Sequence, residues 1–145
     1  MSYQEAELVH QADLAKSRSE LGSAFLRILG YFREDGDKAI GAIEQAMRER
    51  NAVALVTPAH TLKGESAQFG AHRLSSMAER IEMVARRCVE TREGPDELIE
   101  VIVGLRPCFT ETMSLLDCDS NPLVARRPAT FGRRSDAPQG FGRAI

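Results

Sequence analysis

The sequence contains no tryptophan, and aromatic residues make up only 6% of its 145 residues. The alternation of β-branched and polar residues that is typical of strands is also hard to find. Aliphatic side chains dominate the apolar fraction, and glycine and proline gather at the ends of apolar segments and in residues 120–145. These features favour an all-helical chain, and the length predicts one domain with a single core.

Long apolar runs are missing as well. No segment is long and apolar enough to span a bilayer, and the acidic side chains within residues 1–13 are unlike a signal peptide. The formal net charge of −2 indicates neither a nucleic-acid-binding nor a membrane-binding surface. We therefore expect a soluble, cytoplasmic protein that binds neither nucleic acid nor membrane.

The cysteines are few and show no pairing pattern. Cys88, Cys108 and Cys118 form no Cys-x-x-Cys pair and fit no zinc-ligand spacing. We expect them to be reduced thiols, with Cys88 and Cys108 packed as small apolar residues. The cysteine pattern therefore predicts no metal site.

The apolar residues that are present recur at helical spacing. We expect a short first helix over residues 4–15 and further helical segments over residues 19–36, with Ser19 as the N-cap, 37–51, 52–69, 71–91 and from 96 onward. Because the connectors are short, the main helices are predicted to pack as an antiparallel four-helix up-and-down bundle. The fold class is thus all-α, with a short extra N-terminal helix and an irregular C-terminal tail.

Several glycines and prolines are expected to interrupt these helices. Asp35-Gly36 is expected to end or bend a helix, and Gly104 and Pro107 to kink the last one. Thr57-Pro58 is consistent with an N-cap followed by a first-turn proline, or with a kink in one long helix. We favour the kinked helix because Leu55 continues the apolar stripe upstream of the proline.

The composition changes near residue 119. Residues 120–145 carry five arginines against the single acidic Asp136, together with several prolines and glycines. We therefore divide the chain into a helical domain over residues 1–119 and a basic tail over residues 120–145, which is predicted to be flexible. Docking of the tail on an acidic surface is the alternative.

His60 is the candidate functional residue. On a helical projection it lies outside the predicted core stripe, and Lys63 and Gly64, three and four residues on, lie beside it. A neutral imidazole is a nitrogen nucleophile near pH 7, and a lysine ammonium offsets the charge of a phosphoryl group. Gly64 costs helix stability but leaves backbone accessible to a partner. The residues predicted to contact that partner are Val53, Val56, Ala67 and Gln68.

A structural interpretation of each residue stays open at this point. A lone surface histidine is usually without function, and Gly64 is also consistent with close helix packing. His10 and His72 are interpreted as ordinary histidines, because neither has comparable neighbours in the sequence.

The stretch His60-Thr61-Leu62-Lys63-Gly64, followed by Ser66, Phe69-Gly70-Ala71, Leu74 and Ile81-Glu82, closely resembles the histidine-containing phosphotransfer (HPt) domain of phosphorelays. The resemblance covers residues 21–116. It implies a four-helix bundle in which His60 accepts the phosphoryl group, Lys63 neutralises it and Gly64 admits the partner. It also suggests that Glu82 orients the His60 ring and that Arg86 supplies a second cation. A solvated Glu82–Arg86 pair is the alternative.

The resemblance further implies reversible phosphoryl transfer to and from receiver-domain aspartates of response regulators or hybrid histidine kinases. Metal and most catalytic groups would then belong to the receiver. We therefore expect a carrier with little catalysis of its own, without a cofactor, with Mg²⁺ on the receiver. The chain also lacks a kinase glycine loop, a P-loop and a receiver-type acidic cluster. It is accordingly expected to be a free-standing, monomeric shuttle.

Two alternatives to a phosphoryl carrier remain. The first is a helical adaptor that binds receivers without carrying phosphate, which the combination of His60, Lys63 and Gly64 disfavours. The second is a dimerising histidine-kinase core, in which an acidic residue normally follows the histidine. Thr61 stands at that position, and this alternative is ranked lower.

Overall fold

The computed structural model describes residues 3–120 of the chain. Within these residues the secondary structure is helical and contains no strand, which confirms the all-helical class. Apart from Ser120, the predicted tail lies outside the described residues. The α-helices are α1 (Gln11–Leu21), α2 (Phe25–Arg48), α3 (Ala52–Gln68), α4 (His72–Thr91), α5 (Ile99–Val103) and α6 (Leu105–Ser120). Short 3-10 helices occupy Tyr3–Glu5, Gly22–Ala24 and Asp96–Leu98.

The chain divides into two compact units, residues 1–113 and residues 114–145. The first unit contains α1 to α5 and the beginning of α6, and all packing discussed below lies within it. The domain boundary expected at residue 119 stays a prediction. Among the described residues, no helix combines the length and the apolar character that crossing a membrane requires.

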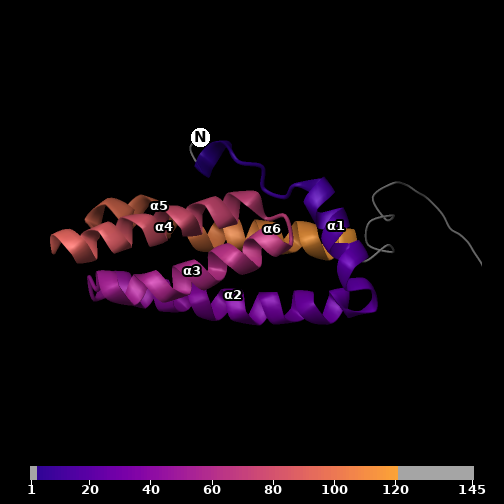
Figure 1. The fold of residues 1–145 in the computed structure, drawn as a ribbon, viewed down its shortest axis with the longest axis horizontal. Helices are drawn as coiled ribbons and strands as arrows, with labels where there is room; N and C mark the ends of the chain where they lie inside the picture. Colours follow the sequence, from indigo (N-terminus) through magenta and orange to yellow (C-terminus); the bar gives the residue numbers. More distant parts are fainter. Residues whose placement is uncertain (1–2, 121–145) are drawn as a thin grey trace, which may run out of the picture. The chain divides into compact units, whose positions relative to one another are not determined.

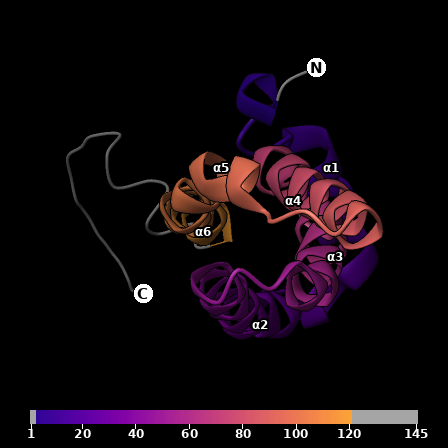
Figure 2. The same cartoon turned by 90° about the vertical axis from the view of Figure 1, so that its left-hand side faces the viewer.

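Helix α3 lies between α2 and α4 and packs against both of them (Figures 1 and 2). The connection from α2 is short, and the side chain of Asn51 caps α3 by accepting a hydrogen bond from Ala54 N–H at 3.1 Å. The connection to α4 turns at Gly70, whose φ is +73°. A Cβ at Gly70 would lie 2.7 Å from the carbonyl oxygen of His10, so only glycine fits this turn.

The core beneath α3 is aliphatic and aromatic. The Phe69 ring stacks on Phe32 with centroids 5.2 Å apart, and Phe25 meets Phe69 edge-on at 5.6 Å. The core stripe predicted for α3 is confirmed, because each member is at most 1% exposed: Leu55, Ala59, Leu62, Ser66 and Phe69. Cys88 and Cys108 are free and buried, also as expected. This packed face of α3 fixes which residues of the helix remain outside.

The helix end considered at Asp35-Gly36, between helices over residues 19–36 and 37–51, is wrong. Helix α2 runs without interruption from Phe25 to Arg48, and Gly36 is buried in its middle. A Cβ at Gly36 would lie 2.6 Å from the ring of Phe109 in α6. The glycine therefore permits close packing of two helices instead of ending one of them.

The other predicted interruptions agree better with the structure. Pro58 lies inside the single helix α3, as we favoured. Gly104 separates α5 from α6. Pro107 lies in the first turn of α6, where a backbone N–H has no partner within the helix, so its absence in proline costs no helical hydrogen bond. The interruption at Gly104 is thus confirmed.

The helix expected over residues 4–15 is also wrong. Only Tyr3–Glu5 forms a 3-10 turn, and α1 begins at Gln11 and extends to Leu21, past the expected N-cap Ser19. The intervening segment bonds to the α3–α4 connection, because His10 N–H donates to Gly70 O at 2.7 Å and Arg73 N–H donates to Glu7 O at 2.8 Å. These long-range backbone bonds replace the helical ones that the local pattern suggested.

Candidate functional site

The imidazole of His60 lies at the surface of α3, outside the buried stripe, where the helical spacing predicts it. About 63% of its side chain is exposed. Its neighbours Ala59 and Leu62 are fully buried and hold α3 in place. The backbone of His60 is therefore fixed by the helix, while the outer edge of its ring remains accessible.

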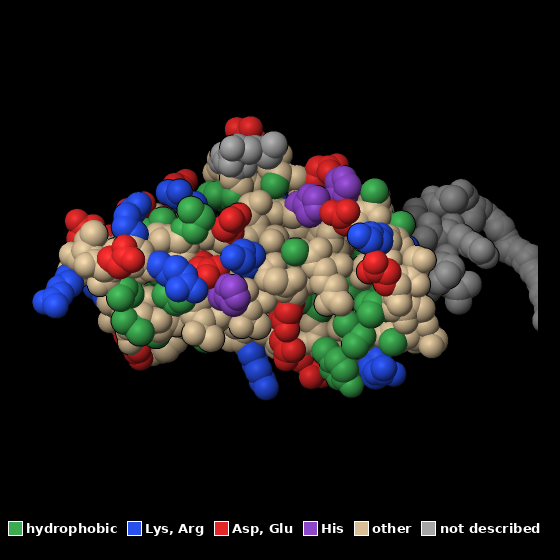
Figure 3. All heavy atoms as spheres, viewed as in Figure 1, with side chains coloured by type: hydrophobic (Ala, Val, Ile, Leu, Met, Phe, Trp, Pro, Cys, Tyr) green, Lys and Arg blue, Asp and Glu red, His purple; other side chains and the backbone are tan. Residues whose placement is uncertain are grey.

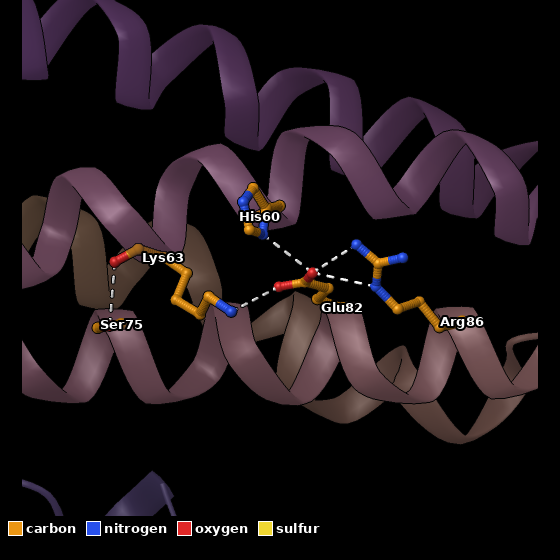
Figure 4. A network of polar contacts seen from close by, with 5 residues as sticks. All are labelled: His60, Lys63, Ser75, Glu82 and Arg86. Atoms are coloured by element: carbon orange, nitrogen blue, oxygen red, sulfur yellow. Dashed lines mark hydrogen bonds and ion pairs between the residues drawn. The ribbon is translucent and has the colours of Figure 1, made fainter.

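The carboxylate of Glu82, on α4, lies beneath His60 and joins three side chains (Figure 4). It accepts a hydrogen bond from His60 Nδ1 at 3.0 Å and pairs with Lys63 Nζ at 2.9 Å. Arg86, one turn further along α4, donates Nε–H at 3.1 Å and an Nη2 hydrogen at 2.8 Å. The side chain of Glu82 is only 7% exposed. The alternative of a solvated Glu82–Arg86 pair is therefore wrong for Glu82.

Glu82 is held ionised by these contacts. Burial alone would raise the pKa of this carboxyl, but the hydrogen bonds from Lys63, Arg86 and His60 outweigh burial and lower the pKa to about 2. An ionised carboxylate only accepts hydrogen bonds, so in neutral His60 the proton resides on Nδ1. The lone pair of the ring is then on Nε2. The arrangement thus selects one nitrogen as the nucleophile.

Lys63 and Gly64 complete the immediate surroundings of His60. The ammonium of Lys63, about a third exposed, points toward the Glu82 carboxylate beside the imidazole (Figure 4). Its backbone carbonyl accepts a hydrogen bond from Ser75 Oγ at 3.1 Å, which links α3 to α4. Sequence reasoning missed Ser75, because nothing local marks a serine that bonds to another helix.

Gly64 is exposed, and a Cβ placed there would meet no described atom within 4 Å. The alternative that Gly64 permits close helix packing is therefore wrong. Glycine is not required at this position by the fold of the described residues.

The four residues predicted to contact a partner all lie on α3, and they differ in exposure. Val53 is 67% exposed, Ala67 and Gln68 are exposed, and Val56 is half-buried. Their role in binding stays a prediction. The side chain of Arg86 is 58% exposed, so its outer edge remains available to an anion near His60.

His10 and His72, interpreted as ordinary histidines for want of comparable sequence neighbours, have polar neighbours in the structure. Their rings stack with centroids 4.7 Å apart, and Asp13 Oδ2 lies 2.7 Å from His72 Nε2. In the sequence, the only sign of this cluster is the i, i+3 spacing of His10 and Asp13, because His72 belongs to another helix.

Residues 27–116 match the family profile described as "Hpt domain", which covers more than half of the chain. The chain therefore belongs to the Hpt family. Hpt domains take part in two-component phosphorelays, where they carry phosphoryl groups and interact with receiver domains. Neither the curated proteins nor the solved structures gave a significant match.

Proposed function

We propose that His60 accepts a phosphoryl group from the aspartyl phosphate of one receiver domain and passes it to the aspartate of another. The observation that carries the proposal is the hydrogen bond between His60 Nδ1 and the buried, ionised Glu82. This bond leaves Nε2 with the lone pair, on a side chain that is mostly exposed. A receiver can then bring its phosphoryl group to that nitrogen.

In the transfer step the Nε2 lone pair attacks phosphorus, and the bond between phosphorus and the aspartate oxygen breaks. The receiver aspartate leaves as a carboxylate. The phosphorylated ring keeps its proton on Nδ1 and carries a positive charge, which the adjacent Glu82 carboxylate stabilises. Attack by a second receiver aspartate on phosphorus reverses these changes and restores neutral His60.

The cations near the ring have a related role. Lys63 and Arg86 neutralise Glu82 in the resting site, and in this scheme they turn toward the phosphoryl oxygens once the group is bound. Because Gly64 has no side chain, the helix surface beside His60 is not covered there, and the active-site cleft of a receiver can approach the imidazole. The protein supplies no cofactor in this scheme, and Mg²⁺ is proposed to reside on the receiver.

We also propose that the main helices form an antiparallel up-and-down bundle. Support comes from the short connections over residues 49–51 and 69–71 and from the packing of α3 against both α2 and α4. The cytoplasmic location and the monomeric state stay predictions.

The test is incubation with a receiver domain that carries ³²P on its aspartate. Label should move to the full-length chain and show the acid-labile, base-stable behaviour of phosphohistidine. His60→Gln should abolish labelling while receiver binding persists, and His72→Gln serves as a matched histidine control that should label normally. Receiver binding without transfer to the wild-type chain would instead support the adaptor function.

A further inference from the structure

A second group of polar side chains lies away from His60, where the N-terminal segment meets the start of α4. In Figure 3 histidine side chains lie next to each other, with acidic side chains against them. The group consists of His10, Asp13 and His72, each with between a third and a half of its side chain exposed. Their potential ligand atoms all lie within 4.8 Å of one another. The phosphotransfer scheme uses none of them.

The hydrogen bonds of His10 show which of its nitrogens has a lone pair. His10 Nδ1 accepts the backbone N–H of Asp13 at 3.3 Å, as the N-cap of α1. In a neutral ring the proton must then reside on Nε2, and a metal that takes the single lone pair of Nδ1 would displace the Asp13 N–H from it. Nε2 lies 3.9 Å from a carboxylate oxygen of Glu7. A histidine that binds a metal through one nitrogen commonly donates the other N–H to a carboxylate, and Glu7 would have to move closer to accept such a bond.

We propose that His10, Asp13 and His72 bind a divalent transition-metal ion of the zinc class. His10 Nδ1 and Asp13 Oδ2 are 3.4 Å apart, which is about the separation of two ligands in a tetrahedral site with bonds of about 2.1 Å. His72 Nε2 is 2.7 Å from the same oxygen and donates its proton to it, so binding requires this pair to open by less than about 1 Å and the His72 proton to move to Nδ1. The His10 and His72 rings, which stack within 8° of parallel, must also turn so that both lone pairs point at one ion. Side chains with this exposure can make that adjustment by rotation.

The chemistry of the three ligands selects the ion. Two imidazoles and one carboxylate suit Zn²⁺, Ni²⁺ or Cu²⁺, whereas Ca²⁺ and Mg²⁺ prefer oxygen ligands throughout. The Asp13 carboxylate, with Glu7 close by, offsets the positive ends of α1 and α4, which would otherwise disfavour a cation. Solvent can supply the fourth ligand because the group is partly exposed.

Binding would join segments that are far apart in the sequence. His72 is 59 residues from Asp13, and the segment carrying His10 already bonds to the α3–α4 connection. A metal bound to the native state alone stabilises that state. A bound metal ion would thus cross-link the N-terminal segment to α4 and stabilise the contact between them.

The experiment is a calorimetric titration of metal-free, full-length protein with zinc chloride in a non-chelating buffer. The exposed thiol of Cys118 is removed in the parent by Cys118→Ser, so that it cannot compete. One ion should bind per chain, and His72→Gln and Asp13→Asn should each weaken binding by at least about tenfold. His60→Gln is the matched control and should bind as the parent does.

Two outcomes would overturn the proposal: a parent that binds no zinc, or a His72→Gln variant that binds as tightly as the parent. Circular dichroism establishes that each variant keeps its helical content. Histidine ring NMR signals give a second measurement that needs no variant of the cluster. Zinc should shift the signals of His10 and His72 and leave those of His60 in place, and the opposite pattern would contradict the proposed ligands.

Discussion

Replacing Glu82 with glutamine removes the charge on which His60, Lys63 and Arg86 converge, and its effect on stability depends on pH. The pKa of Glu82 is about 2 in the folded protein, against an ordinary value of 4.5. A lowered folded-state pKa contributes stability that is present above pH 4.5 and is lost as the pH falls toward 2. The shift corresponds to about 3 kcal/mol in the free energy of unfolding.

The prediction concerns the difference in unfolding free energy between the wild type and Glu82→Gln. Other carboxyl groups titrate in both proteins and cancel, so the difference isolates Glu82. Between pH 6 and pH 3 the wild type should lose about 2 kcal/mol relative to the variant, because most of the linked titration lies in that window. Urea unfolding followed by circular dichroism at both pH values gives the two free energies.

The matched control is Glu97→Gln, which removes a surface carboxylate with about half of its side chain exposed and paired with Arg87. Its pH-dependent difference should be much smaller, because exposed ion pairs contribute little. A Glu82→Gln difference that stays constant within about 0.5 kcal/mol from pH 6 to pH 3 would refute the claim that the three contacts depress the pKa of Glu82.

The remaining predictions concern α2 and α3. Gly36→Ala should lower the free energy of unfolding by about 1 kcal/mol, because overpacking against Phe109 exceeds the gain in helix propensity. The control Gly41→Ala, whose Cβ would meet no described atom within 4 Å, should raise it. Equal unfolding free energies for the two variants would contradict this. Gly64→Leu should leave the melting temperature nearly unchanged and slow phosphorylation by a receiver, and transfer at the native rate would count against the access role. Lys63→Ala should slow transfer about tenfold in rapid-quench kinetics, and an unchanged rate would exclude charge neutralisation by Lys63.

The surface position of His60 was predictable from the sequence because it depends on local periodicity. Residues three or four apart on a helix are neighbours whatever the helix packs against. The apolar stripe that ends at Phe69 therefore indicated which face of α3 is buried and left His60, Lys63 and Gly64 together outside it. The family resemblance added Glu82 as a candidate, but it did not establish whether that carboxylate is buried or solvated.

Only the tertiary structure decided features that depend on residues far apart in the chain. The sequence suggested a helix break at Gly36, but in the structure this glycine packs against the ring of Phe109. His10 has no notable neighbour in the sequence, but its ring stacks on that of His72. Burial of Glu82 under His60 likewise results from the packing of α4 on α3. Sequence periodicity specifies the faces of individual helices, whereas the pairing of those faces, and hence the tautomer of His60 and the charge of Glu82, is set by contacts between helices.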